Sequence, residues 1–327
     1  MVEQILSRSA AGRDQMPLDA FDVIMKRSNE CESKATTKRW SNVQKATATL
    51  SRKPKLGQNF LTDIGAIHKI VDALGDVSQK MVVEIGPGRG ALTDVLANRA
   101  ARLVAVELDR VLSAQLRMKY ATRPNVEVIE ADVLTVDFHT MLGKRPGPLR
   151  DLRPTAQEKV RVVGNLPYYI TSDILLALFA ASDVIESIVV MLQLEVADRI
   201  AAKPGSSEYG LLSATAQLYT KVEKLFTLPP EAFQPPPKVH SAVLRLTVAP
   251  RIQELGVDEK KFVEFLKLTF AQKRKTLFNN LRDRYEGAAV KRAMADAGLK
   301  SDVRAEAINL DKAAKLFHLL EAATQAH

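Results

Sequence analysis

The sequence predicts an α/β protein, with a mostly parallel sheet, helices on both faces of that sheet, and a small all-helical domain after it. Two observations lead to this prediction. Short apolar segments alternate with segments of helical periodicity between residues 81 and 192, and this order of elements is typical of parallel sheets. After Pro250 only helical periodicity remains.

The candidate parallel strands are apolar segments at 81–85, 103–106, 126–129, 160–163 and 187–192. The helices expected between them lie notably at 91–96, 112–120 and 172–181. The alternating segment 239–248 predicts an antiparallel strand that closes the sheet beside the last parallel strand.

The chain divides into three parts. Residues 1–50 are rich in Ser, Thr, Lys and Arg with little sustained periodicity, and we expect a mostly disordered extension. Residues 51–249 hold the predicted sheet. Residues 250–327 form the small helical domain, with helices expected at roughly 259–283, 288–297 and 311–323. The proline-containing stretch 143–159 predicts an exposed loop.

Charge and composition narrow the function classes. Lysine and arginine number 47 against 38 for aspartate and glutamate, a net charge of +9, which favours a polyanionic partner. The single cysteine, Cys31, excludes an internal disulfide framework, and the five histidines lack ligand spacing, so no metal site is expected. No apolar stretch approaches the ~20 residues of a membrane-spanning helix. We expect a cytoplasmic monomer without membrane contact.

A glycine turn, Gly86-Pro87-Gly88-Arg89-Gly90, lies where the first strand meets its helix. Glycines let the backbone pass close to a ligand at the carboxyl end of a strand, where open α/β sheets bind nucleotides. The third glycine of the dinucleotide fingerprint is missing, because Ala91 stands one residue past Gly90. The turn therefore favours a nucleoside cofactor over NAD, with a plain strand-to-helix connection as the alternative.

Three acidic residues stand at consecutive strand ends. Glu107 lies about 20 residues past the glycine turn, where a carboxylate can accept both ribose hydroxyls of an adenosine; a solvent-facing strand end is the alternative. Asp132 could accept the amine of the cofactor's adenine, or could equally be a turn or cap aspartate. Glu84 could anchor the turn or the cofactor's ammonium group.

The segment Asn165-Leu166-Pro167-Tyr168 follows the 160–163 strand. Proline at 167 holds Leu166 extended, which leaves the Leu166 carbonyl free to accept a hydrogen bond. Two acceptors placed on the hydrogens of an adenine N6 amine, here Asn165 Oδ1 and the Leu166 carbonyl, would turn its lone pair toward an electrophile. Tyr168 offers a stacking face for the same base.

Phe233 lies before the proline run 235–237 and could stack on the other side of the base, although ordinary packing is the favoured reading for Phe233 taken alone. Basic residues are candidates for neutralising phosphates, with a solvated surface as the common alternative. They are Arg52, Lys53, Lys55, Lys238, Lys273, Arg274 and Lys275.

Taken together, five blocks resemble the KsgA-type ribosomal RNA adenine dimethyltransferases, and the resemblance covers about residues 53 to 320. The glycine turn is shared with many methyltransferases, whereas the other four blocks in this order are specific. The blocks are Gln58–Leu61, Glu84–Thr93, Asn165–Tyr168, Phe233–Val239 and Gln272–Leu277.

The resemblance implies a Rossmann-like class I methyltransferase domain with a small helical RNA-binding domain, and S-adenosylmethionine as cofactor. The implied substrate is a pair of adjacent adenines in a hairpin near the 3′ end of small-subunit rRNA, met within an immature ribosomal subunit. Each adenine would receive two methyl groups at N6. The implied cofactor contacts are Asn59, Leu61, Gly86, Glu107, Asp132 and Asn165.

Two positions depart from the family pattern: Tyr169, where the family usually has a polar residue, and Leu194, where it usually has lysine. The nearest alternative is an erythromycin-resistance-type methyltransferase, which acts on large-subunit rRNA but usually lacks the 272–277 block and the 235–237 prolines. The other alternative is chiefly a ribosome-assembly factor, which the basic helical domain motivates.

Overall fold

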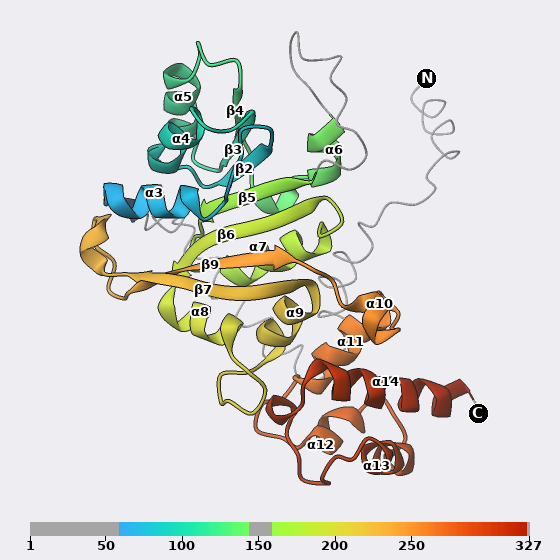
Figure 1. Cartoon of the computed structure of the whole chain (residues 1–327). Coiled ribbons are helices and arrows are strands. Elements are labelled where there is room, and N and C mark those ends of the chain that lie inside the picture. Colours follow the sequence, from blue (N-terminus) through green and yellow to red (C-terminus); the bar gives the residue numbers. More distant parts are fainter. Residues whose placement is uncertain (1–58, 144–158, 326–327) are drawn as a thin grey trace, which may run out of the picture. The chain divides into compact units, whose positions relative to one another are not determined.

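The computed structural model describes residues 59–143 and 159–325 (Figure 1). The expected extension at 1–50 and most of the expected loop at 143–159 lie outside the described residues. Within the described part, no helix combines the length and apolarity needed to cross a membrane.

A seven-stranded sheet organises the described chain, in the order β4-β3-β2-β5-β6-β9-β7. The strands from β4 to β6 in this order are parallel to their neighbours, and β9 runs antiparallel to both β6 and β7. All five expected parallel strands are confirmed within a few residues. The strands are β2 Met81–Ile85, β3 Arg102–Glu107, β4 Val126–Glu130, β5 Val160–Asn165, β6 Ile185–Gln193, β7 Thr220–Leu228 and β9 Ser241–Val248.

Strand β7 has no counterpart in the sequence prediction, and it closes the sheet in place of β9. Strand β9 pairs antiparallel with β6, which confirms the expected position of the 239–248 strand beside the last parallel strand. It also pairs with β7 on its other side, so the expectation that it closes the sheet is wrong. Charged residues at 221, 223 and 224 interrupt the apolar pattern of β7. Such charges are usual on an edge strand, which exposes one row of unpaired backbone groups.

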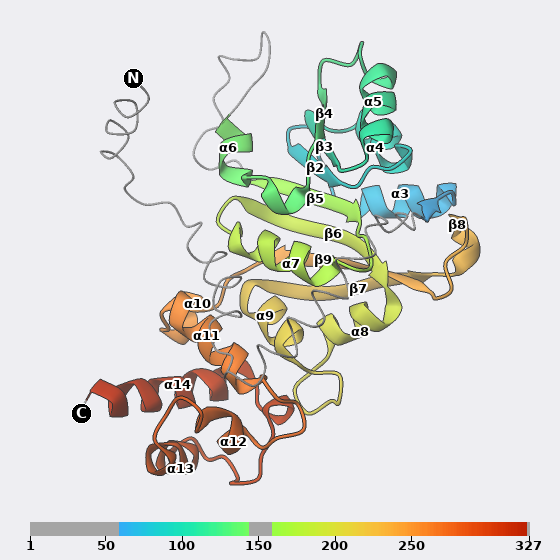
Figure 2. The same cartoon turned by 180° about the vertical axis from the view of Figure 1, so that it is seen from behind.

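Helices cover both faces of the sheet, as Figures 1 and 2 show from opposite sides. Alternate residues of a strand point to opposite faces, and neighbours such as Val162 and Val163 accordingly belong to different hydrophobic clusters. One cluster contains residues of α3 and α4, and the other contains residues of α7 and α9. The predicted layers are therefore confirmed. These helices are α3 Ile64–Asp72, α4 Ala91–Leu96, α7 Thr171–Ala180 and α9 Leu211–Tyr219.

The remaining helices include three on the sheet domain and five after Pro250. The former are α5 Arg110–Lys119, α6 Phe138–Gly143 and α8 Leu194–Ala201. The latter are α10 Ile252–Leu255, α11 Glu259–Thr269, α12 Leu277–Leu281, α13 Gly287–Asp296 and α14 Leu310–Gln325. Short 3-10 turns lie at Val133–Thr135, Pro230–Ala232 and Ala305–Ala307.

The single helix expected at 259–283 is wrong, because the chain turns between α11 and α12. The buried side chain of Asn280 donates from Nδ2 to the carbonyls of Thr269 (2.8 Å) and Gln272 (3.3 Å), which satisfies the end of α11 and holds the turn. Thr276 then caps α12 by accepting from the Asn279 main-chain N–H. The basic residues 273–275 consequently lie in a turn and not on a helix.

The helices after Pro250 share a hydrophobic core with the sheet. One cluster of buried residues includes Val190 of β6, Leu218 of α9, Phe265 of α11 and Leu320 of α14. Phe265 also contacts Phe317 in a tilted arrangement, with ring centres 5.5 Å apart. The helical part is thus packed against the α9 side of the sheet domain.

A separate two-stranded sheet joins two distant blocks of sequence. Strand β1 (Phe60–Leu61) pairs antiparallel with β8 (Phe233–Gln234), with Leu61 opposite Phe233. Two hydrogen bonds to the Ala232 carbonyl, from Thr62 N (2.9 Å) and Thr62 Oγ1 (3.2 Å), extend the pairing. This sheet places the segment before α3 beside the proline-rich loop.

Candidate active site

The glycine turn packs beneath the side chain of Phe60. Gly88 has a left-handed φ of +60°, and a Cβ at this position would lie 3.0 Å from the Phe60 ring, so a side chain at 88 would meet both backbone strain and a clash. The Arg89 guanidinium lies 4.4 Å from the centre of the same ring, a cation–π contact. Phe60 therefore fixes the turn against β1. The sequence motifs do not predict this contact between Phe60 and the glycine turn.

Glu107 holds the glycine turn to the end of β3. Its side chain is 4% exposed. Oε2 accepts from Gly88 N and Oε1 accepts from Asp109 N, both at 2.9 Å. The alternative of a solvent-facing strand end is therefore wrong. Each carboxylate oxygen keeps further acceptor capacity, so the two ribose hydroxyls of a nucleoside could still bind here.

Glu84 is buried under the turn. It is 1% exposed and accepts a hydrogen bond at 2.7 Å from Thr93 Oγ1 in the first turn of α4. Burial raises the pKa of the Glu84 carboxyl to about 8, and the nearby carboxylate of Glu107 adds to this. Glu84 thus anchors the helix that follows the turn.

Asp132 is an N-cap. Its Oδ1 accepts from Leu134 N at 3.0 Å, which matches the turn reading offered by the sequence. The Ala131 N–H donates to the Glu107 carbonyl at 3.0 Å, so Asp132 follows directly on the strand beside Glu107. Its second oxygen has no hydrogen-bond partner among the described residues, and its contact with the cofactor's adenine stays a prediction.

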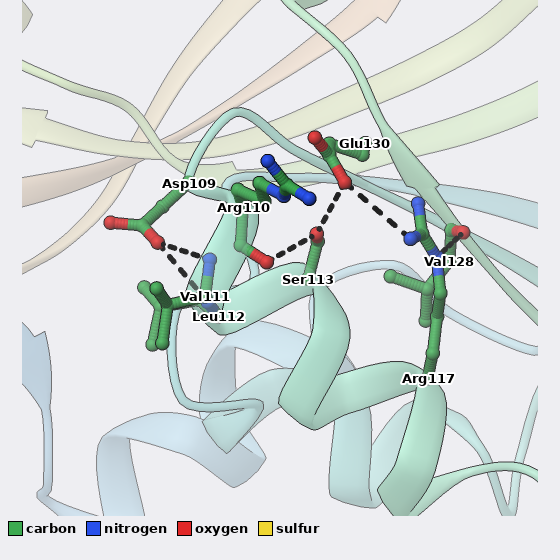
Figure 3. Close-up of polar contacts among 8 residues, drawn as sticks. All are labelled: Asp109, Arg110, Val111, Leu112, Ser113, Arg117, Val128 and Glu130. Carbon is green, nitrogen blue, oxygen red and sulfur yellow. Dashed lines mark hydrogen bonds and ion pairs between the residues drawn. The ribbon is translucent and has the colours of Figure 1, made fainter.

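Polar contacts between α5 and β4 fix the two loops that carry these acids (Figure 3). Asp109 caps α5 by accepting from Val111 N at 2.8 Å. Farther along α5, Ser113 Oγ donates to Glu130 Oε2 at 3.3 Å, and Arg117 Nη1 lies 3.5 Å from the same oxygen. Because Glu130 ends β4, these contacts set the position of the chain that leads to Asp132.

Asn165 ends β5 next to the glycine turn, since a Cβ on Gly86 would lie 3.7 Å from the Asn165 carbonyl. Its Nδ2 donates to the Asn59 carbonyl at 3.1 Å. A carbonyl can only accept, so this contact turns Asn165 Oδ1 away from Asn59 and leaves it available as an acceptor. Nothing in the sequence indicates that Asn165 pairs with the main chain of Asn59.

Leu166 and Pro167 differ in what their carbonyls do. Leu166 N donates to the Met191 carbonyl at 2.9 Å, and the Leu166 side chain is 1% exposed. The Pro167 carbonyl accepts from Thr171 Oγ1 (2.9 Å) and from Ile170 N (3.3 Å). The Leu166 carbonyl has no partner in the described part of the chain, which agrees with the expectation that it is free to accept.

Tyr168 and Phe233 lie in different surroundings. Tyr168 is half-buried, and its hydroxyl lies 3.3 Å from Ser241 Oγ at the start of β9. Phe233 is 3% exposed and belongs to the hydrophobic cluster that also contains Leu61 and Met191. The structure thus gives Phe233 the packing role weighed as its alternative. Stacking on a base would require its ring to leave this cluster, and that role stays a prediction.

Asn59 and Leu61, which the family resemblance implies as cofactor contacts, also lie in different surroundings. The Asn59 carbonyl is engaged by Asn165, and the Leu61 side chain is 6% exposed within the cluster of Phe233. The structure therefore gathers Asn59, Gly86, Gly88, Glu107 and Asn165 around the carboxyl ends of β2, β3 and β5. The Leu61 side chain contributes to packing.

The candidate RNA-binding cations fall into three groups. Lys238 is exposed on the loop that leads into β9. Lys273, Arg274 and Lys275 are exposed in the turn between α11 and α12, and their side chains form no ion pair within the part of the chain that the structure describes. Arg52, Lys53 and Lys55 lie outside the described residues.

Comparison with known proteins yields consistent relatives. The family model described as ribosomal RNA adenine dimethylase matches residues 49–322. A Koribacter versatilis protein named ribosomal RNA small subunit methyltransferase A is 64% identical over 270 residues, which are 83% of this chain and 95% of that protein. The protein of the same name from Acidobacterium capsulatum is 56% identical over 270 residues, 82% of this chain and 91% of that protein.

Two solved structures are similar over most of the chain. The 23S rRNA methyltransferase ErmE is 28% identical, with a TM-score of 0.58, and the match covers 80% of this chain and all of that one (100%). A dimethyladenosine transferase from Plasmodium falciparum is 24% identical, with a TM-score of 0.63, and covers 82% of this chain and 98% of its own. The likeness to the second structure concerns the fold, which is the Rossmann-like methyltransferase fold expected from the sequence.

Proposed function

Because the chain belongs to the ribosomal RNA adenine dimethylase family, we propose that it methylates small-subunit (16S) rRNA during ribosome biogenesis. Four methyl groups pass from S-adenosylmethionine to N6 of two adjacent adenines in a 3′-terminal hairpin. The observation that carries the proposal is the pair of acceptors at the end of β5: Asn165 Oδ1, oriented by Asn59, and the Leu166 carbonyl, which has no partner among the described residues. Two acceptors side by side suit the two hydrogens of one amine.

The site suits an adenosine-containing cofactor. The Glu107 carboxylate, which faces the turn at Gly88, retains acceptor capacity for the ribose hydroxyls, and Asp132 keeps one free oxygen for the adenine amine. The left-handed Gly88 lets the backbone approach the ligand closely. When bound, S-adenosylmethionine supplies an electrophilic methyl group on a positively charged sulfur.

The residues of β5 prepare the adenine. Asn165 Oδ1 and the Leu166 carbonyl accept the N6 hydrogens and turn the nitrogen lone pair out of conjugation with the ring. Burial of Leu166 at 1% exposure fixes that carbonyl in place. No side chain has to act as a general base, because the proton on the product nitrogen can pass to water after transfer. Catalysis by this chain therefore consists of positioning.

Tyr168 and Phe233 hold the base in this proposal. A base drawn out of its stack gains ~1–3 kcal/mol from each aromatic face that it meets. Tyr168 lies two residues past Leu166 and is only half-buried. Phe233 would complete the clamp by leaving the cluster in which it packs.

RNA outside the site is held by phosphate contacts from Lys238 and from the turn 273–275, together with Arg52, Lys53 and Lys55 of the adjoining segment. The substrate is the rRNA within an immature ribosomal subunit. The protein acts as a monomer in the cytoplasm and does not bind a membrane. The cations at 273–275, which are exposed and form no ion pair with any described residue, also favour a second role, in which binding to immature subunits assists their assembly.

Primer extension tests the activity, because N6,N6-dimethyladenine stops reverse transcriptase. Small subunits from a strain that lacks the modification are incubated with the protein and S-adenosylmethionine. We expect two adjacent stops near the 3′ end of 16S rRNA, and their loss with Asn165→Ala. Stops in large-subunit rRNA would support the erythromycin-resistance-type alternative instead. If Asn165→Ala restores subunit maturation in cells without restoring the stops, assembly outranks methylation.

A further inference from the structure

The turn after the acceptor pair carries two consecutive tyrosines with different surroundings. Tyr168 and Tyr169 are the central residues of the turn that Ile170 N closes onto the Pro167 carbonyl, at 3.3 Å. Tyr168 is half-buried and touches Ser241. Tyr169 is 65% exposed, and within the described part of the chain its hydroxyl forms no hydrogen bond and its ring stacks on no other aromatic ring.

Isolated exposed apolar side chains are common and need no special explanation. Tyr169 differs from the others in kind and in place. The remaining large exposed hydrophobic side chains of the described residues are aliphatic or methionine: Ile64, Leu108, Val111, Met118 and Val239. Tyr169 is the one aromatic ring in this set, and it adjoins the residues that orient the target amine.

The proposed substrate contains a nucleobase on which an exposed aromatic ring could stack. The two substrate adenines are neighbours in the RNA, so drawing one of them into the site removes the stacking partner of the base next to it. An aromatic face compensates an unstacked base by ~1–3 kcal/mol. Tyr168 and Tyr169 are consecutive residues of one turn, so the proposed stacking of one base on Tyr168 leaves a second aromatic residue next in the chain for the adjacent base.

The neighbouring loop fits the same occupant. The contact between Tyr168 and Ser241 brings the turn beside the loop that leads into β9. On that loop Val239 is 40% exposed, and Lys238 is exposed and forms no ion pair with the residues that the structure describes. An apolar surface with a free cation next to it suits a nucleobase and the phosphate attached to it.

We propose that Tyr169 is a second base platform, whose ring stacks on the nucleobase next to the adenine held by Asn165 and Leu166. The inference rests on the proposed function, since it takes the rRNA substrate as given. It assigns Tyr169 to substrate binding and to the preference for a purine beside the target, while cofactor binding does not depend on it.

The test compares Tyr169→Ala, Tyr169→Phe and the unchanged protein on unmethylated small subunits. We expect Tyr169→Ala to raise the Kd for subunits by about 5- to 100-fold and Tyr169→Phe to change it by less than about threefold. S-adenosylmethionine affinity, measured by calorimetry, should be the same in all three, which also shows that the variants fold. Met118→Ala serves as the matched control, because Met118 is 81% exposed on α5.

A second set of subunits carries uridine in place of the base on one side or the other of the target adenine. Uracil stacks weakly, so on one of these substrates the penalty of Tyr169→Ala should shrink several-fold. An unchanged Kd for Tyr169→Ala, or an equal penalty on every substrate, would overturn the base platform. Failure of the unchanged protein to produce any stop in 16S rRNA would instead overturn the proposed function.

Discussion

The side-chain amide of Asn165 donates to the main-chain carbonyl of Asn59 across 3.1 Å, which joins the end of β5 to the residue before β1. The bond does more than connect two segments that lie 106 residues apart. It decides which end of the amide faces the site, because only the nitrogen can be directed at a carbonyl oxygen. The acceptor needed for the adenine amine is thereby preorganised.

The variant Asn165→Asp tests this orientation. Aspartate has nearly the same size but cannot donate, so its carboxylate would face the Asn59 carbonyl without a hydrogen bond. Loss of one preorganised polar group in a site commonly costs about 10²- to 10³-fold in turnover, and we expect a loss of that size in single-turnover methylation of unmethylated subunits.

The control for this variant is Asn98→Asp, at an exposed position in the turn that follows α4. Asn98 Nδ2 also donates to a main-chain carbonyl, that of Asp94, at 2.9 Å. This variant should keep full activity. Near-normal turnover of Asn165→Asp would show that the Asn59 contact does not orient a functional group.

How far the sequence predicts this site depends on the kind of contact. The positions of Glu107 and Asn165 at strand ends could be predicted, because the carboxyl ends of neighbouring parallel strands meet at one edge of the sheet. Their contacts with a cofactor and a base stay predictions. The role of Asn59 was not predictable from side-chain types, since its main-chain carbonyl makes the contact. Phe233 is buried because β8 pairs with β1. Strands of two residues are too short to be predicted from the sequence pattern.

The errors in the fold have similar causes. Helical periodicity continues through 270–276, so only the side-chain hydrogen bonds of Asn280 reveal that the chain turns there. Strand β7 starts directly after α9 and carries three charges, so neither a turn signal nor clean alternation marks it. Tertiary pairing with β9 makes it a strand.

Two substitutions of Phe233 distinguish its packing role from its proposed stacking role. Phe233→Ala removes a side chain that is 3% exposed and should destabilise the fold by about 3–5 kcal/mol. Phe233→Leu retains most of the packing but presents no ring to a base. We expect Phe233→Leu to melt within a few degrees of the unchanged protein, to bind S-adenosylmethionine normally, and to lose at least about tenfold in turnover. Normal turnover would leave Phe233 with a packing role alone.

Glu107→Gln addresses the cofactor site. The carboxylate accepts from two main-chain N–H groups, those of Gly88 and Asp109. An amide has one accepting oxygen, so one of these donors would face an NH2 group and lose its partner. We expect S-adenosylmethionine to bind about 10- to 100-fold more weakly, because the ribose hydroxyls would lose a charged acceptor and hydrogen bonds to charged groups contribute about 1.5–3 kcal/mol. Calorimetry measures this, and an unchanged Kd would remove Glu107 from the cofactor site.

Glu84 predicts a pH dependence of stability. Its pKa is about 8 in the folded protein against an ordinary value of 4.5, so between these values the folded state holds a proton that the unfolded state has released. The free energy of unfolding from this group is therefore greatest below about pH 4.5 and falls as the pH rises to about 8, by at most about 1.4 kcal/mol per pH unit. Glu84→Gln stays neutral, so its free energy of unfolding should rise relative to that of the unchanged protein as the pH increases over this range.

Urea unfolding at about pH 5 and about pH 8 measures the effect of Glu84→Gln. The difference in unfolding midpoint between variant and unchanged protein should widen at the higher pH. Glu208→Gln removes the same charge from an exposed loop and should show no such widening. A difference that is constant with pH would mean that Glu84 is ionised in the folded protein.

The basic turn between α11 and α12 predicts a change in salt dependence. Each phosphate neutralised by a cation contributes about 0.7 to 0.9 to the slope of log K against log salt concentration. Replacing Lys273, Arg274 and Lys275 together by glutamine should therefore make the slope for binding to unmethylated subunits shallower by about 2, because all three side chains are exposed and unpaired in the described chain. Replacing Lys300, Lys312 and Lys315 changes the net charge equally, at exposed positions elsewhere on the helical domain. An equal effect of both triple variants would attribute the slope to overall charge, whereas an effect confined to the first places the rRNA against this turn.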